Sequence, residues 1–238
     1  VGYSCTVQEK ATDSAKSIFI TTQHSEQKFK RLGVEVKMVQ DFKYIEDELG
    51  NPLQLEAKIQ SLGDLTEVKA EFSVPNKVIV TSVVNGVKEI REIPLDKKVL
   101  FPYAISKLLK ENPDKDSIQF STIDPHTDFR IISVTYEKLG EESLKADNLP
   151  DLYSKYKVII DLLPNIGNYE WYDSQGRLVK GTSSILNIEQ IAVSKDKISE
   201  KYDADDIFYK SLVPVKNPIT DPLKLSQVTY KVQTGDSH

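Results

Sequence analysis

The chain has 238 residues, with 31 basic and 36 acidic side chains, a net charge of -5 and 39% hydrophobic residues. This composition is typical of a globular protein with one large all-β domain or two small ones. Acidic and basic residues are interspersed and no basic stripe is present, so a nucleic-acid partner is not expected. No run of about 18 apolar residues occurs, so no membrane-spanning helix is expected. The single cysteine excludes an internal disulfide, and with three histidines it cannot supply a structural zinc site; we expect no metal and no cofactor.

The first half of the chain alternates apolar and polar residues. Tyr3, Cys5 and Val7 alternate with polar neighbours, and the same period of two recurs over residues 34–38, 53–60 and 68–74. A period of two with one apolar face predicts antiparallel strands that are covered on one side. Strands are expected at residues 2–10, 17–31, 34–45, 53–60, 68–74 and 78–84. Asn85-Gly86, which has strand pattern on both sides, predicts a two-residue hairpin.

One helix interrupts the strands. Pro102 suits a first helical turn, Ile105, Leu108 and Leu109 mark one apolar face, and Asn112-Pro113 ends the helix near Glu111. We expect this face to pack on the concave side of the sheet. Strands resume at residues 117–123, 130–137, 153–162, 168–172, 178–185 and 189–194, with a tight turn at 173–176.

The pattern changes near residue 200. Residues 201–206 are charged, and Pro214, Pro218 and Pro222 recur at intervals of four, which predicts a stiff, extended linker. An alternating stretch over residues 225–232 begins a further strand. We therefore expect a domain over residues 1–200 and a linker with a first strand over 201–238. The fold class predicted is all-β with minor α: a strongly curved antiparallel meander, or half-barrel, with one inserted amphipathic helix.

Several short segments carry a resemblance to a known arrangement. They are residues 1–4, 30–33, 91–94, 101–104, 122–125, 170–178 and 212–222. In this order they resemble the non-catalytic β-rich region that precedes the transglutaminase-like domain (papain-like superfamily) of certain bacterial envelope proteins. The outline also resembles the half-barrel of periplasmic lipoprotein carriers, which is an analogy of fold only.

The resemblance implies a location and a partner. It implies a bacterial envelope protein, periplasmic or extracellular, in which a downstream catalytic domain of the same polypeptide is the partner. The chain opens at Val1 without a methionine or a signal peptide, so we expect that the native N-terminus lies upstream. A transglutaminase-like site needs a nucleophilic cysteine at a helix N-terminus, whereas Cys5 lies in a strand pattern. The resemblance therefore implies that catalysis belongs to the downstream domain and that this chain is not an enzyme.

Cys5 is the one residue that could act as a thiol nucleophile, with His24 or His126 as its base. Because Cys5 alternates with Tyr3 and Val7, the interpretation as a small core residue is favoured. No catalytic residue is therefore assigned.

Two further groups are candidate ligand-binding sites. Asp124, His126 and Asp128 combine carboxylates with an imidazole, which suits a divalent ion, but they also fit a turn between strands, and the turn is favoured. Trp171 and Tyr172 could bind a glycan or a peptide at a sheet edge, but Trp171 could also plug the end of the curved sheet, and the plug is favoured.

The expected function is a non-catalytic accessory or binding module, placed before a transglutaminase-like domain, with a peptide, glycan or lipid as possible ligand. The alternative is a periplasmic carrier that holds an apolar ligand, a lipid or a lipoprotein, on the concave face. A filled interior favours the module, and a cavity of several hundred cubic ångströms favours the carrier.

Overall fold

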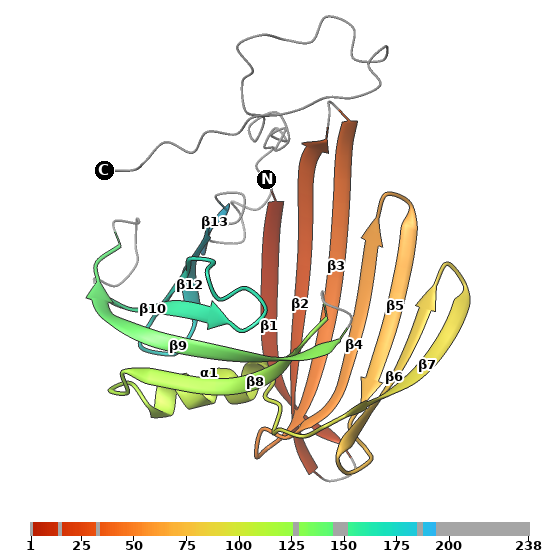
Figure 1. Cartoon of the computed structure of the whole chain (residues 1–238). Coiled ribbons are helices and arrows are strands. Elements are labelled where there is room, and N and C mark those ends of the chain that lie inside the picture. The colour runs from red at the N-terminus through yellow and green to blue at the C-terminus, as the bar shows by residue number, and fades with distance from the viewer. Residues whose placement is uncertain are drawn as a thin grey trace, which may run out of the picture.

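A computed structural model describes residues 2–13, 16–31, 34–125, 129–144, 152–184 and 188–193. These residues form two antiparallel sheets and one helix, and in Figure 1 the strands of the second sheet run across those of the first. The all-β class with antiparallel pairing and one inserted helix is confirmed. The meander is divided in two at the helix, and neither sheet closes on itself.

The first sheet contains seven strands in chain order. They are β1 (Gly2–Asp13), β2 (Lys16–Arg31), β3 (Val34–Asp47), β4 (Pro52–Ser61), β5 (Asp64–Glu71), β6 (Lys77–Val84) and β7 (Val87–Pro94). The predicted hairpin joins β6 to β7 with Val84 opposite Val87. Asn85 and Gly86 have φ angles of 48° and 85°. Both residue types tolerate positive φ, which explains why the turn forms at this dipeptide.

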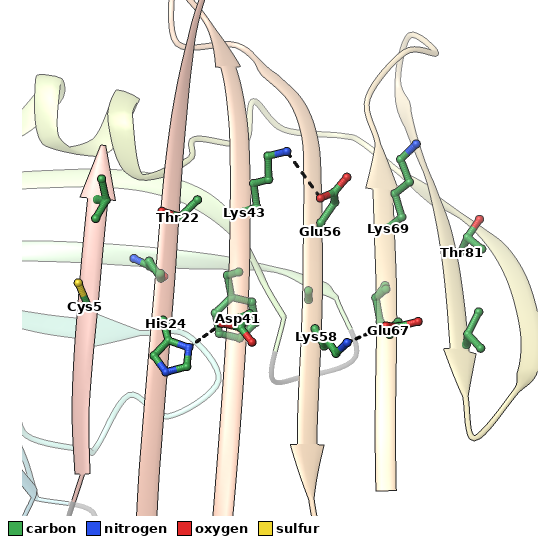
Figure 2. A pocket seen from close by; sticks show the side chains of 16 residues that line it. Cys5, Thr22, His24, Asp41, Lys43, Glu56, Lys58, Glu67, Lys69 and Thr81 are labelled. Carbon is green, nitrogen blue, oxygen red and sulfur yellow. Dashed lines mark hydrogen bonds and ion pairs between the residues drawn. The ribbon is translucent and has the colours of Figure 1, made fainter. Parts of the chain in front are cut away.

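One face of the first sheet, the outer face, is polar. It carries the odd-numbered residues of β3 and the even-numbered residues of β4, and Figure 2 shows it with the helix on the far side of the sheet. Cys5 lies on this face at the edge strand β1 and is exposed. The expectation that Cys5 is a core residue is therefore wrong. β1 and β2 alternate as the sequence indicates, but on β1 neither face is covered.

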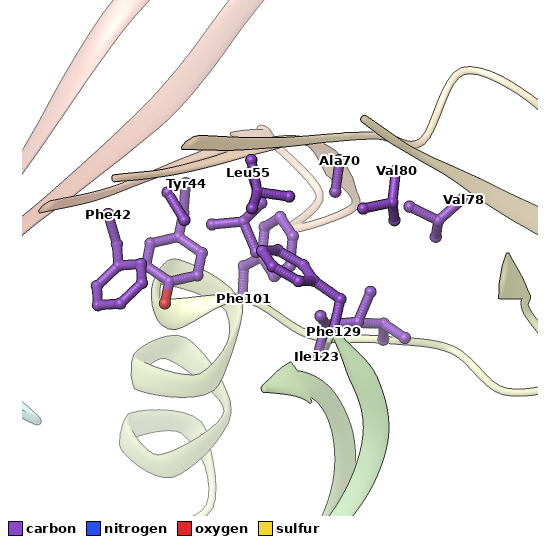
Figure 3. Packing of buried hydrophobic residues seen from close by; sticks show 12 residues of the cluster. Phe42, Tyr44, Leu55, Ala70, Val78, Val80, Phe101, Ile123 and Phe129 are labelled. Atoms are coloured by element: carbon purple, nitrogen blue, oxygen red, sulfur yellow. The ribbon is translucent and has the colours of Figure 1, made fainter. Parts of the chain in front are cut away.

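The opposite, inner face holds the first part of the core (Figure 3). Leu55, Val78 and Val80 have no exposed surface and pack with Phe101, which is also fully buried and lies at the start of the helix. Ile123, from the second sheet, belongs to the same cluster. The inner face of the first sheet is thus covered by the start of the helix and by one end of the second sheet.

The helix α1 (Pro102–Glu111) has the predicted bounds. Its Leu109 is 4% exposed and joins the core of the second sheet, with Ile105 and Leu108 packed against that core. The sequence predicted that this face packs on the concave side of one continuous sheet, whereas it packs on the second of two sheets. Two positions near the helix start contact β2 and β3 instead: Tyr103 stacks on Phe19 with ring centroids 3.7 Å apart, and the amide of Ala104 binds β3.

The second sheet contains six strands in the order β13-β12-β11-β10-β9-β8. Their bounds are β8 (Ser117–Asp124), β9 (Arg130–Glu142), β10 (Tyr153–Ile160), β11 (Asn168–Tyr172), β12 (Leu178–Ser183) and β13 (Ile188–Ile191). The predicted turn before β12 is present: the amide of Gly176 donates to the carbonyl of Asp173, and the hydroxyl of Ser106 in α1 donates to the carbonyl of Gly176. The predicted linker and final strand over residues 201–238 lie outside the described residues.

Among the described residues, no helix combines the length and the apolar character needed to cross a bilayer.

Candidate functional site

A shallow depression of about 550 Å³ lies on the outer face of the first sheet (Figure 2). Two rows of directly opposite residues cross the strands here. One row contains Cys5, His24, Asp41, Lys58, Glu67 and Val83, and the other contains Val7, Thr22, Lys43, Glu56, Lys69 and Thr81. Because directly opposite residues of antiparallel strands share a face, register alone brings these side chains together.

Three neighbouring strands each place an acid and a lysine on this face, two positions apart. Asp41 and Lys43 lie on β3, Glu56 and Lys58 on β4, and Glu67 and Lys69 on β5. Antiparallel pairing sets an acid against a lysine at almost every crossing, with Lys43 3.9 Å from Glu56 and Lys58 3.3 Å from Glu67. Each exposed pair contributes little to stability, about 0–1 kcal/mol.

The charges of the depression are therefore balanced. Each lysine has a carboxylate partner, since Lys69 pairs with Glu71 at 2.8 Å. The surface therefore carries alternating acidic and basic side chains without a net charge. The acid-x-Lys repeat at positions 41, 56 and 67 is a signal in the sequence that could have found this surface.

Cys5, His24 and Asp41 are consecutive members of one row. Nδ1 of His24 lies 2.6 Å from Oδ1 of Asp41, and Nε2 lies 3.2 Å from the hydroxyl oxygen of Tyr3. Both ring nitrogens thus have partners other than the Cys5 thiol. A nucleophile activated by histidine needs a thiol–imidazole contact, and the hydrogen bonds of His24 are directed elsewhere.

Two carboxyl groups of the described residues are enclosed by other parts of the chain, that of Glu46 fully and that of Glu170 in part. Glu46 on β3 has no exposed surface, and its oxygens accept hydrogen bonds of 2.9 Å from the amides of Tyr103 and Ala104. Burial raises the pKa of Glu46 from 4.5 to about 7, although the two amides oppose that rise. Because the N-cap residue Phe101, which precedes the helix, provides no side-chain hydrogen bond, this distant carboxyl takes that role.

The second of these carboxyls belongs to Glu170, a half-buried residue on β11. Its Oε2 accepts hydrogen bonds from the hydroxyls of Tyr136, at 2.7 Å, and Tyr172, at 2.5 Å. Burial raises the pKa of Glu170, while the two hydroxyls lower it. The alternation of the sequence does not predict that Glu170 is enclosed, because a glutamate flanked by aromatics also fits an exposed edge.

The two predicted aromatic ligand residues lie on opposite faces of β11. Trp171 is 5% exposed, and the Nζ atoms of Lys155 and Lys180 lie 4.9 and 5.2 Å from its ring centre. Tyr172 is half-buried and contacts Tyr136 and Tyr156. The two side chains therefore do not form one platform, and binding at either remains a prediction.

The predicted Asp124, His126 and Asp128 group is described only in part. Asp124 ends β8, opposite Arg130, and lies close enough to Tyr44 to raise, after burial, the pKa of that phenol. His126 and Asp128 lie outside the described residues. Among the residues that are described, no cluster of three or more histidine, cysteine or acidic side chains could hold a metal ion.

Comparisons with known proteins bear on the fold. No family model matches the sequence, and no curated relative matches it. Among solved structures, the chain is similar to a β-barrel-like protein of the domain of unknown function DUF1849 from Brucella abortus. That match has a TM-score of 0.56 and 14% sequence identity, and covers 75% of this chain and 80% of the other. The likeness shows a shared fold.

Proposed function

We propose that this chain is a non-catalytic accessory module of a larger bacterial envelope protein, and that it precedes a transglutaminase-like domain of the same polypeptide. Its role is to position an extended polar substrate for that domain. The surface for this role is the outer-face depression, where paired lysines and carboxylates offer alternating donors and acceptors.

The filled interior carries this proposal. Leu55, Val78, Val80 and Phe101 have no exposed surface, so the inner face of the first sheet is occupied by the side chains of the chain itself at this point. A carrier of acyl chains needs a sizeable apolar cavity instead. The likeness to a β-barrel-like protein is compatible with a carrier and keeps it as the alternative.

The geometry around Cys5 supports the non-catalytic part of the proposal. The thiol lies on an exposed edge strand, and the imidazole of His24 is engaged by Asp41 and Tyr3. A Cys5→Ser change should therefore leave the acyl-transfer activity of the full-length protein unchanged. Loss of activity with unchanged folding would show that the nucleophile is Cys5 of this module.

A lipid titration separates the module from the carrier. A fluorescent fatty acid is titrated into the chain and into Phe101→Ala, which opens space in the core. For the unmodified chain we expect no saturable uptake, and for Phe101→Ala a loss of about 3–5 kcal/mol of stability. Saturable micromolar uptake by the unmodified chain would establish the carrier instead.

A peptide titration tests the surface itself. An extended peptide with alternating Lys and Glu is titrated into the chain and into Lys58→Glu. The matched control is Lys157→Glu on β10, which breaks an exposed pair with Glu137 on the second sheet. We expect that Lys58→Glu weakens binding several-fold and that Lys157→Glu does not. Equal effects of both changes would show that only net charge matters.

A further inference from the structure

Strand β1 is an exposed sheet edge. Eleven of its twelve residues are exposed, and the twelfth, Ala11, is partly so. Within the described part of the chain, β1 pairs with β2 alone. Its outward N–H and C=O groups therefore form a row that another strand can bind.

The other three sheet edges are protected in the ways that native proteins commonly use. β7 ends on Pro94 and carries four charged residues, Lys88, Glu89, Arg91 and Glu92. β13 has only four residues. At β8, Val99 forms a β-bridge with Ser121, and the carbonyl of Ser121 accepts a hydrogen bond from the amide of Leu100. In contrast, residues 2–8 of β1 contain no charge and no proline.

We propose that β1 is a self-association surface, and that its partner is β1 of a second copy of this chain. The two strands pair antiparallel about a twofold axis at Cys5, which joins two seven-stranded sheets into one continuous sheet. This inference concerns an interface and is independent of the function proposed above.

The sequence of β1 is complementary to itself in this register. A twofold axis perpendicular to the sheet keeps each face on its own side, so it pairs residues of the same parity. About Cys5, it sets Tyr3 opposite Val7 on the outer face and Ser4 opposite Thr6 on the inner face. Tyr3 and Val7 are 36% and 51% exposed, and an aromatic paired with a β-branched side chain stabilises a strand pair.

Charge selects this register over its neighbours. With the axis at Cys5, the paired segment of the described strand runs from Gly2 to Gln8. All of its residues are uncharged. Moving the axis to Thr6 or Val7 brings Glu9 and Lys10 into the paired segment, where charges lose water without an opposite partner. A shared uncharged segment therefore favours the axis at Cys5.

The size of the contact sets the strength. Seven residues per strand span about 24 Å. A single strand pair of this length buries less surface than the roughly 800 Å² per partner of a standard stable interface. The dimer should therefore depend on concentration. It should also persist when the thiol is reduced, because strand pairing and not a disulfide holds it.

Sedimentation velocity under reducing conditions tests the surface. Cys5→Lys places two ammonium groups opposite each other at the axis, whereas the matched control Cys5→Thr keeps an uncharged β-forming residue. Up to about 1 mM, where small interfaces associate, we expect the unmodified chain and Cys5→Thr to dimerise and Cys5→Lys to stay monomeric. Monomers in all three, or equal dimerisation of both variants, would overturn the proposal.

Cross-linking tests the register. In a Cys5→Ser background, Tyr3→Cys and Val7→Cys are treated separately and as a mixture with diamide, which oxidises two thiols to a disulfide and is reduced to its hydrazine. We expect the mixture to cross-link several-fold more than either variant alone. Cross-linking of Val7→Cys alone at the rate of the mixture would place the axis at Val7 and overturn the proposed register.

Discussion

Oε1 of Glu46 lies 2.9 Å from the amide nitrogen of Ala104, which joins the C-terminal end of β3 to the first turn of the helix across 58 positions of sequence. The same helix packs its Leu109 into the second sheet. A single buried carboxyl therefore anchors the element that connects the two sheets.

Replacing Glu46 should destabilise the fold through the helix start. Glu46→Ala leaves two buried amides without an acceptor, and each such group costs about 1–3 kcal/mol. Glu46→Gln retains one carbonyl oxygen and should cost less. Urea denaturation measures both, and an effect of Glu46→Ala below about 0.5 kcal/mol would show that solvent replaces the carboxyl readily.

The stability of the chain should fall as the pH rises from about 4.5 to about 7. The pKa of Glu46 is raised from 4.5 to about 7 on folding, so between these values the folded chain holds a proton that the unfolded chain has lost. The resulting stabilisation, on the order of 3 kcal/mol, is fully present below about pH 4.5 and is lost as the pH passes 7.

The measurement for this dependence is the difference in unfolding free energy between the unmodified chain and Glu46→Gln. Glu170, whose pKa is also raised, contributes in the same direction, and taking the difference removes its contribution. We expect the difference to decline from pH 5 to pH 8. A difference that is flat over that range would contradict a raised pKa for Glu46.

Removing one phenol from the Glu170 cluster should be costly. Tyr136→Phe deletes a 2.7 Å hydrogen bond to the carboxyl inside a packed core, and we expect a loss of about 1–3 kcal/mol. The matched control is Tyr3→Phe, because that hydroxyl bonds His24 on an exposed strand and its loss should fall within about 0.5 kcal/mol. Thermal unfolding compares the two, and similar shifts would mean that burial adds nothing to the hydrogen bond.

Backbone conformation should decide the effect of glycine substitutions. Gly86 has a φ of 85°, and a Cβ added there would meet no atom within 4 Å, so Gly86→Ala should cost about 1–2 kcal/mol from conformation alone. Gly181 lies in β12 without a positive φ, and its Cβ would meet Gln190 at an ordinary 3.8 Å. Gly181→Ala should therefore be neutral or stabilising by up to about 1 kcal/mol in the same denaturation assay, and the opposite order would refute this explanation.

Part of the candidate surface was accessible to sequence reasoning. The acid-x-Lys repeat on three strands predicts a balanced, polar face once those strands are known to pair in order. The capping role of Glu46 was not accessible, because nothing local relates residue 46 to residue 104. The partial burial of Glu170 was also not accessible, since alternation indicates which side chains share a face and not what covers that face.

The sequence by itself determined which segments form the strands, the hairpin and the helix, although β5 lies at Asp64–Glu71 and not at the predicted 68–74. Alternation gives strands their period, Asn85-Gly86 supplies the two positive φ angles of the turn, and Pro102 and Pro113 bound the helix; all these depend on interactions between neighbouring residues. Only the tertiary structure decided that the meander divides into two sheets, that α1 packs on the second, and that Cys5 is exposed at an edge. Those outcomes depend on which surfaces meet after the strands have formed, and contacts between distant residues settle them.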